Sequence, residues 1–153
     1  MFLYKLAKEL NKLNIQYALV GGHAVAIHGA TRGTMDIDFI LKWELSNLEA
    51  TEKALSNLGL VSRLPISASD IFNFRKEYIK NRNLIGWNFY NPIRPSELVD
   101  IIITHDLSKI KTTKVNYHQT KITVISKKDL IQMKKESGRP QDLFDIEALE
   151  KTQ

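Results

Sequence analysis

The sequence predicts an α/β (α+β) protein in which helices flank a mixed, twisted β-sheet. Segments with apolar residues at helical spacing are interleaved with short apolar runs of strand length, and Gly, Asn or Pro separates many of them. The elements do not follow the strict alternation of strands and helices that a doubly wound sheet requires. The chain contains no internal repeat, low-complexity tract or Gly/Ser linker. We therefore expect one domain over residues 1–153.

The first part of the chain contains three predicted helices and two predicted strands. Apolar residues in the first segment recur at the spacing of an amphipathic helix, and Asn14 marks its end. Gly21-Gly22 stops the first strand, and Gly59 ends the third helix. The predicted helices cover residues 2–13, 23–30 and 45–58, and the predicted strands cover residues 16–20 and 35–41.

The second part of the chain is predicted to contain four more strands and three more helices. Ser126 and Asp129 form a pattern typical of a capping box, with Asp in place of Glu. Gly138 ends the helix that starts there, and Pro140 suits the first turn of the last helix. The predicted strands cover residues 60–64, 84–90, 98–104 and 121–125, and the predicted helices cover residues 67–80, 126–137 and 140–151.

Composition narrows the class of protein. No apolar run approaches the roughly 20 residues needed to cross a bilayer, so we expect no membrane partner. Cysteine is absent, which excludes disulfides and thiolate chemistry, and this usage fits a cytoplasmic protein. Lys and Arg number 22 against 17 Asp and Glu, a net charge of +5. This balance favours anionic partners such as nucleotides or nucleic acid, although it also serves solubility alone.

Two aspartates in the strand predicted over 35–41 are the first candidates for chemistry. Because side chains alternate along a strand, Asp36 and Asp38 project to one face, and Ile37 and Phe39 project to the other, where a core can take them. Two carboxylates this close repel each other unless a cation lies between them. A hard divalent cation with oxygen ligands, Mg²⁺ or else Mn²⁺, would supply that charge. The alternative is an Asp-x-Asp sequence at a strand end with no function.

Gly21-Gly22 lies where the first strand meets a helix. Glycines at such a corner allow the backbone to approach a ligand closely, and the N–H groups of the first helical turn face an anion. The pattern is neither a Walker loop nor a dinucleotide fingerprint. Taken alone, a Gly-Gly pair is more typical of a tight strand–helix turn that binds nothing. Since one short helix separates this corner from the strand of Asp36 and Asp38, adjacent strands would place the two features side by side.

Asp100 interrupts the strongly apolar strand predicted over 98–104. An isolated carboxylate inside a buried strand costs several kcal/mol unless it is paired or liganded. If this strand lies beside that of Asp36 and Asp38, the three carboxylates could hold two cations that bridge the phosphates of a nucleotide. The alternative is a solvated Asp100 at a strand end.

These features together resemble the DNA polymerase β-type nucleotidyltransferase superfamily, and in particular its small toxin-like members from abortive-infection systems. The pattern Gly-Gly-x-Ala-x-x-x-His-Gly-x-x-Arg-x-Thr-x-Asp-x-Asp carries the resemblance. It is matched by Gly21, Gly22, Ala24, His28, Gly29, Arg32, Thr34, Asp36 and Asp38.

The resemblance implies a nucleotidyltransferase fold and a division of roles. Gly21 and Gly22 would bind the triphosphate, and Asp36 and Asp38 would hold the metal ions. Asp100 would be the third catalytic carboxylate, as a metal ligand or as the base for the acceptor hydroxyl.

Four further residues are candidates for nucleotide binding. The segment 129–145 is similar to a Lys…Arg-x-x-Asp-x-x-Asp signature of the toxin-like relatives, in which Lys134 and Arg139 could meet phosphate charge. The alternative for Arg139 is a local ion pair with Asp142. Arg32 and Thr34 precede the acidic strand and could touch phosphate or orient the carboxylates.

From these residues we expect a Mg²⁺-dependent enzyme that transfers a nucleoside monophosphate from a nucleoside triphosphate, such as ATP, to an acceptor hydroxyl and releases pyrophosphate. The acceptor could be tRNA or other RNA, a partner protein or a small molecule, and a homodimer could complete the site. The resemblance suggests a toxin–antitoxin setting. Two alternatives remain open, namely a non-catalytic nucleotide-binding or antitoxin-like regulatory module on the same fold, and a basic nucleic-acid-binding domain.

Overall fold

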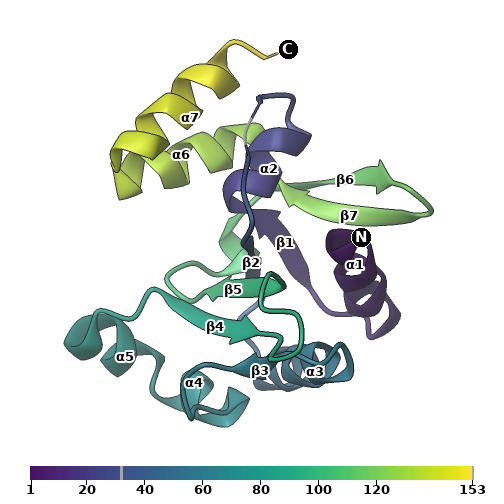
Figure 1. The fold of residues 1–153 in the computed structure, drawn as a ribbon. Coiled ribbons are helices and arrows are strands. Elements are labelled where there is room, and N and C mark those ends of the chain that lie inside the picture. The colour runs from purple at the N-terminus through teal and green to yellow at the C-terminus, as the bar shows by residue number, and fades with distance from the viewer. Residues whose placement is uncertain (32, 153) are drawn as a thin grey trace.

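A seven-stranded mixed sheet lies at the centre of the molecule, and helices pack around it (Figure 1). The computed structural model describes residues 1–31 and 33–152. The strands are β1 (Tyr17–Val20), β2 (Ile37–Leu41), β3 (Val61–Ser62), β4 (Gly86–Tyr90), β5 (Leu98–Ile102), β6 (Thr112–Tyr117) and β7 (Thr120–Ile125). Their order across the sheet is β3-β4-β5-β2-β1-β7-β6. The predicted fold class is therefore confirmed.

The helices fall into groups around this sheet. They are α1 (Phe2–Lys12), α2 (Gly21–Ile27), α3 (Leu45–Asn57), α4 (Ala68–Asn73), α5 (Arg75–Arg82), α6 (Lys127–Ser137) and α7 (Pro140–Glu150), with one 3-10 turn at Leu107–Lys109. In Figure 1, α6 and α7 lie together at the top of the view, whereas α3, α4 and α5 lie at the bottom, with β5 and β2 between the two groups. None of the described helices combines the length and the hydropathy that crossing a bilayer requires.

The central strands are positioned by their apolar side chains. All four residues of β1 are buried, and four of the five in β2 are buried, Asp38 being the exception. Strand β2 pairs antiparallel with β1 and parallel with β5. Trp87 of β4 is fully buried, and its ring packs edge-on against that of Phe89 at a centroid distance of 4.8 Å. Strands rich in charged residues would be unstable at the buried centre of a sheet. The apolar side chains of β1, β2 and β5 therefore favour the central positions for these three strands.

The structure corrects several predicted boundaries. The helix predicted over 67–80 is two helices, because Phe74 has φ −115° and ψ 21° and serves as the last cap of α4 and the first cap of α5. The helix predicted to begin at 23 begins at Gly21. The strand predicted over 35–41 begins at Ile37, so that Asp36 lies just before it.

One strand, β6, was not predicted at all. Its sequence, TTKVNY, leaves three consecutive residues exposed at its start and has little apolar content. The strand exists because it forms an antiparallel hairpin with β7, whose turn places His118 at a φ of 54°. Pairing with a well-defined neighbour therefore supplies what the local sequence lacks.

Asn47 joins three elements beneath the sheet. Its side-chain oxygen accepts a hydrogen bond from the Gln16 N–H (2.9 Å), and its amide donates to the carbonyls of Gln16 (2.9 Å) and Lys42 (3.0 Å). These bonds tie α3 to the start of β1 and the end of β2. We expect Asn47→Ala to lower the free energy of unfolding by about 1 to 2 kcal/mol, because it removes three hydrogen bonds and leaves the part-buried Gln16 N–H without its acceptor.

Urea unfolding would measure this change. The matched control is Asn57→Ala on the same helix, since Asn57 is exposed and bonds only Glu9 (3.2 Å) among the described side chains. Equal effects of the two substitutions would show that Asn47 does not hold these elements together.

Candidate active site

Asp38 and Asp100 lie directly opposite each other on neighbouring strands. The register of β2 against β5 pairs Asp38 with Asp100, as it pairs Ile37 with Val99 and Phe39 with Ile101. Because the strands are parallel and in this register, the two carboxylates emerge on the same face of the sheet. Both are half-buried among apolar side chains. The predicted placement of the Asp100 strand beside the Asp38 strand is thus confirmed.

Two glycines make room for these carboxylates. Gly21 follows β1, has a φ of +67°, and its Cβ position would overlap the Asp38 Oδ2 atom. Gly86 begins β4, and its Cβ position would overlap the Asp100 Oδ1 atom. Any larger residue at either position would push the neighbouring carboxylate away. Each acid is therefore flanked by a glycine on the side facing away from the other acid.

The environment favours the neutral forms of both acids. Burial, together with the charges of Asp100 and Asp36, raises the pKa of Asp38 to about 7. The charges of Lys134 and Arg139 lower it but do not offset these effects. The pKa of Asp100 is raised to about 6, first by burial and then by the charge of Asp36. A bound cation would therefore stabilise the ionised forms of both carboxyls at neutral pH.

Asp36 occupies a different environment from the other two acids. It lies at the bend before β2 and is exposed to solvent. Its backbone carbonyl is 3.4 Å from the Thr34 hydroxyl, which places Thr34 beside the acids but not among them. The prediction that Asp36 lies within the strand is wrong, although its charge still acts on both Asp38 and Asp100.

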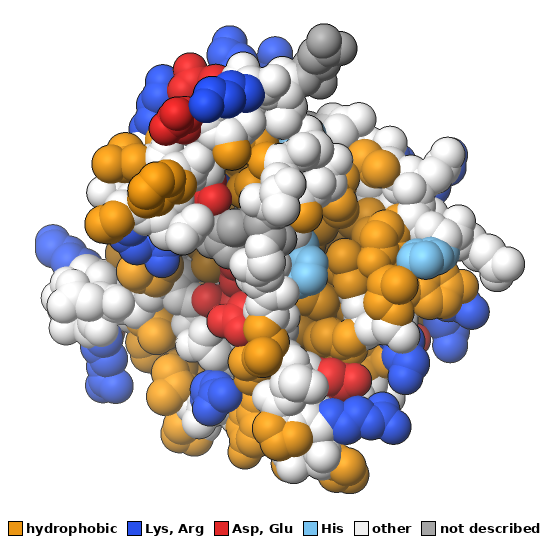
Figure 2. Space-filling model, turned by 45° about the horizontal axis from the view of Figure 1, so that its top comes forward, with side chains coloured by type: hydrophobic (Ala, Val, Ile, Leu, Met, Phe, Trp, Pro, Cys, Tyr) orange, Lys and Arg blue, Asp and Glu red, His pale blue; other side chains and the backbone are white. Residues whose placement is uncertain are grey.

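A cavity of about 270 Å³ opens next to Asp38, and we call it the carboxylate cavity. It is lined on one side by Asp38 and Ile102 of the sheet and by Gly21 at the start of α2. Residues of α6, including Lys134, and Arg139 at the N-cap of α7 line the other side. In the space-filling view of Figure 2, acidic side chains gather near the centre of the face, whereas Lys and Arg side chains lie mainly toward its edges.

Lys134 is held by two buried acids behind this cavity. Its ammonium lies 2.9 Å from Asp145 Oδ2 and 3.3 Å from Asp142 Oδ1, and only 7% of the side chain is exposed. Arg139 binds Asp142 through Nε (2.9 Å) and Nη2 (3.3 Å), while 73% of its side chain stays exposed. Burial alone would raise the pKa of Asp142, but these hydrogen bonds hold it well below its usual range. The local pair of Arg139 with Asp142 therefore exists alongside its position on the cavity.

The remaining candidates for nucleotide binding are distributed around this site. Gly22 is buried in the first turn of α2, directly after Gly21. Arg32, which the sequence analysis also assigned to nucleotide binding, lies outside the described residues. The structure thus brings Gly21, Lys134 and Arg139 to one cavity, whereas Gly22 and Thr34 are not among the residues that line it.

Sequence reasoning missed two residues that support Asp100. Asn88 is its register partner on β4, and the Asn88 amide donates a 2.7 Å hydrogen bond to Asp100 Oδ1. Gly86 gives the space described above. A glycine inside a strand is itself a signal of close approach, and Gly86 could have been found in this way. The register that places Asn88 beside Asp100 could not.

The donor set suits a hard divalent cation. Asp38 and Asp100 offer carboxylate oxygens with raised pKa values, which is the ligand chemistry that Mg²⁺ and Mn²⁺ prefer. Within residues 1–31 and 33–152, however, no group of three or more His, Cys, Asp or Glu side chains is already arranged to hold a metal ion. The carboxylates of Asp38 and Asp100 thus suit a divalent cation in their chemistry. Asp36 would have to turn toward them to supply a third carboxylate ligand.

Comparison with solved structures places the chain among nucleotidyltransferases by fold. A nucleotidyltransferase-like protein from Paracoccidioides brasiliensis aligns with a TM-score of 0.59 at 18% identity, covering 94% of this chain and 71% of that one. The lincosamide antibiotic adenylyltransferase LnuA with bound lincomycin gives a TM-score of 0.63 at 16% identity, covering 97% and 94%. The protein ANT(2'')-Ia in complex with adenylyl-2''-tobramycin gives 0.61 at 12% identity, covering 96% and 84%.

These likenesses show the nucleotidyltransferase fold that the resemblance to the polymerase β-type superfamily predicted. No protein-family model matches the sequence, and no curated protein matches it either.

The raised pKa of Asp38 makes stability depend on pH. Its carboxyl holds a proton in the folded state up to about pH 7, against 3.8 for the ordinary group, so the unfolding free energy falls as pH rises through this window. We expect Asp38→Asn to be more stable than the wild type by about 1 to 2 kcal/mol at pH 8 without divalent cations. The difference should vanish near pH 4.

Urea unfolding at the two pH values would measure this difference. Asp106→Asn serves as a control of opposite sign. Burial would raise the pKa of Asp106, but hydrogen bonds from the Ser108 and Trp43 N–H groups lower it, so its loss should destabilise the protein at pH 8. If the difference in unfolding free energy between Asp38→Asn and the wild type is the same at pH 8 and pH 4, Asp38 does not bury an unpaired charge.

Lys134 should contribute strongly to stability. Lys134→Met removes the ammonium between two buried carboxylates, and we expect a loss of about 3 kcal/mol in the free energy of unfolding. The neighbouring Lys135 is exposed, so Lys135→Met should change stability little. Thermal or urea unfolding of both variants at pH 7 would measure the difference, and a stable Lys134→Met variant would show that the ion pairs are dispensable.

Proposed function

We propose that the protein is a Mg²⁺-dependent nucleotidyltransferase that moves a nucleoside monophosphate from a nucleoside triphosphate to an acceptor hydroxyl. The observation that carries the proposal is the pair Asp38 and Asp100, two half-buried carboxylates in register, of which Asp38 lines the carboxylate cavity. Two like charges side by side in an apolar sheet destabilise the folded state, so their presence indicates a function. The fold likeness to LnuA, which is named an adenylyltransferase, supports the same chemistry and ATP as a donor.

The reaction balances without any further reactant. The oxygen of the acceptor hydroxyl forms a bond to the α-phosphorus of the nucleoside triphosphate, and the bond from that phosphorus to the bridging oxygen of the pyrophosphate breaks. The proton of the hydroxyl passes to a base and then to water. Asp100 would either accept this proton, since its pKa is raised to about 6 in the metal-free site, or hold the metal together with Asp38.

Three carboxylates would hold the metal. Asp38 and Asp100, with Asp36 turned toward them, would bind Mg²⁺ or Mn²⁺, and the bound cation would neutralise phosphate charge and ease the departure of pyrophosphate. The residues of the chain act on the nucleotide in other ways. Gly21 and Gly22 allow close approach of the triphosphate, and the exposed end of Arg139 can reach phosphate oxygens.

Lys134, Thr34 and Arg32 complete the proposed nucleotide side of the site. Lys134 is committed to Asp142 and Asp145, so it contributes positive potential at the cavity wall and not a mobile ligand. Thr34 would orient Asp36 through the backbone. A toxin–antitoxin setting, and tRNA, a partner protein or a small molecule as the acceptor, stay part of the proposal.

Transfer can be tested with labelled nucleotides. Incubation of the protein with α-³²P-labelled ATP, CTP, GTP or UTP, Mg²⁺ and a cell extract should label an acceptor with at least one nucleotide. We expect Asp38→Asn and Asp100→Asn to reduce labelling at least about 100-fold, since each removes a ligand of the metal. Glu150→Gln, an exposed acid on α7, should leave labelling unchanged.

The same experiment separates the alternatives. Nucleotide binding without labelling, retained in Asp38→Asn, would support a non-catalytic regulatory module. Labelling that survives both aspartate substitutions, or persists in excess chelator, would contradict the assignment of these carboxylates as the metal site.

A further inference from the structure

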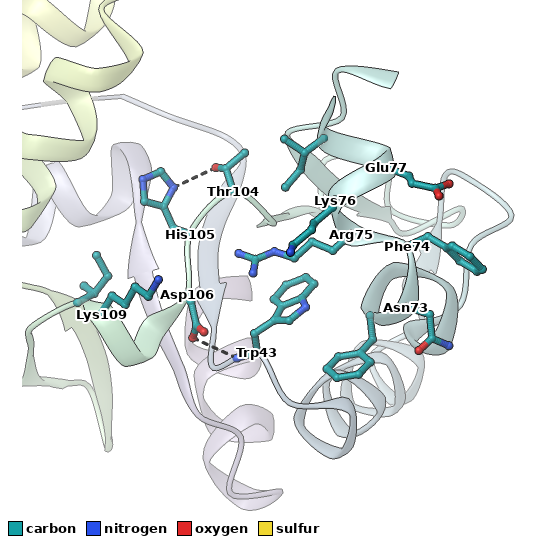
Figure 3. Close-up of a pocket in the computed structure, with 13 residues that line it drawn as sticks. Trp43, Asn73, Phe74, Arg75, Lys76, Glu77, Thr104, His105, Asp106 and Lys109 are labelled. Atoms are coloured by element: carbon teal, nitrogen blue, oxygen red, sulfur yellow. Dashed lines mark hydrogen bonds between the residues drawn. The ribbon is translucent and has the colours of Figure 1, made fainter. Parts of the chain in front are cut away.

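A second cavity adjoins the carboxylate cavity and has no role in the site described above. Its volume is about 680 Å³, and we call it the Trp43 cavity. Trp43 follows β2, the junction of α4 and α5 forms a second wall, and residues 104–110 after β5 form a third (Figure 3). Thr104 and His105 line both cavities. A molecule bound in the Trp43 cavity would therefore reach the wall of the proposed reaction site.

Arg75 is fixed in place at the centre of this cavity. Its Nε donates a 2.7 Å hydrogen bond to the Ile103 carbonyl, and its guanidinium carbon lies 4.2 Å from the centroid of the Trp43 ring. Its terminal Nη groups make no hydrogen bond to any residue that the structure describes. A guanidinium held in this way has two donors in a fixed plane, which matches the geometry of a phosphate group.

The other charges around Arg75 favour an anion. Figure 3 shows the side chains of Lys76 and Lys109 directed toward the space beside Trp43, whereas Glu77 points away from it. Neither lysine forms an ion pair within the described part of the chain. Asp106 also lines the cavity, and its charge acts on Arg75, while its carboxylate accepts hydrogen bonds from the N–H groups of Trp43 (3.2 Å) and Ser108 (3.0 Å). The lining therefore carries Arg75, Lys76 and Lys109 against Asp106 and Glu77, a small excess of positive charge.

The walls also offer a surface for a ring. The Trp43 side chain is half-buried, and Arg75 extends its planar surface, so an aromatic ring can stack there. Phosphate and a flat heterocycle occur together in nucleotides. The combination of fixed guanidinium, two free ammonium groups and an aromatic wall matches that chemistry better than it matches a neutral or cationic molecule.

We propose that the Trp43 cavity binds the acceptor of the reaction, and that this acceptor is a nucleotide, either free or at the end of an RNA. Its phosphate would bind Arg75, Lys76 and Lys109, its base would stack at Trp43, and a ribose hydroxyl would point toward Thr104 and the carboxylate cavity. The acceptor role rests on the proposed function, whereas the binding of a nucleotide in this cavity does not.

Fluorescence titration can test the binding by itself. Trp87 is fully buried in the core, so a ligand that changes tryptophan emission reports on Trp43. Without divalent cations or triphosphate, we expect adenosine 5′-monophosphate to quench this emission, and adenosine to bind about tenfold or more weakly because it lacks the phosphate. Asp38→Asn should retain the binding, which separates this cavity from the proposed catalytic one.

The matched variants remove two charges each. Lys76→Ala with Lys109→Ala should weaken the binding of adenosine 5′-monophosphate about tenfold or more, since both contacts to phosphate are lost. Lys80→Ala with Lys111→Ala makes the same change in net charge at exposed positions outside the cavity and should leave the affinity within about twofold. Equal losses in both pairs, or no quenching by adenosine 5′-monophosphate or RNA, would overturn the proposal.

A single-stranded RNA hexamer distinguishes the two sources of the nucleotide. If the hexamer binds at least about tenfold more tightly than adenosine 5′-monophosphate, and loses this affinity in the Lys76 and Lys109 pair, the acceptor is an RNA end. If it binds equally or more weakly, the acceptor is a free nucleotide. Loss of labelling in Asp38→Asn with nucleotide binding retained would support both proposals, whereas binding without any transfer would contradict only the enzyme.

Discussion

The repulsion between Asp38 and Asp100 is the constraint on which the rest of the site depends. The register of β2 against β5 places the two carboxylates opposite each other, and burial raises the pKa of both. Neither has a lysine or arginine within ion-pairing distance among the described residues. The strands cannot slip to separate the acids, because a shift of one residue would turn Ile37 and Phe39 out of the core.

The residues around the pair preserve this arrangement. Gly21 and Gly86 leave the space that the carboxylates occupy, and Asn88 fixes one of them with a hydrogen bond. Each of the two glycines weakens the element that contains it, the start of α2 or the strand β4, since glycine costs conformational entropy and adds no packing. Local features that weaken a fold and yet converge on one point are typical of a functional site.

The sequence predicted the central architecture well because that part of the fold is governed by apolar burial. The runs that became β1, β2 and β5 are short, apolar and bounded by turn residues, and their adjacency put Asp38 beside Asp100 as expected. Features that depend on tertiary contacts could not be predicted from the sequence. The strand β6 depends on β7, the break at Phe74 depends on how α4 and α5 pack, and the partnership of Asn88 with Asp100 depends on register. Lys134 was recognised as important, but its burial between Asp142 and Asp145 could not be read from spacing.

The charges around the carboxylate cavity also explain why an anionic substrate would bind there only together with cations. The protein as a whole carries a net charge of +5, yet at Asp38 burial and the charges of Asp100 and Asp36 outweigh those of Lys134 and Arg139. Lys134 and Arg139 are already engaged by Asp142 and Asp145, so they lower the pKa of Asp38 without restoring it to its ordinary value. A triphosphate entering alone would meet net repulsion, whereas one that arrives with divalent cations would supply the charge that Asp38 and Asp100 lack. The Trp43 cavity has the opposite balance around Arg75, so the two cavities select differently charged partners on either side of Thr104 and His105. A metal-bound nucleotide and a bare phosphate-bearing acceptor would be sorted by this difference alone.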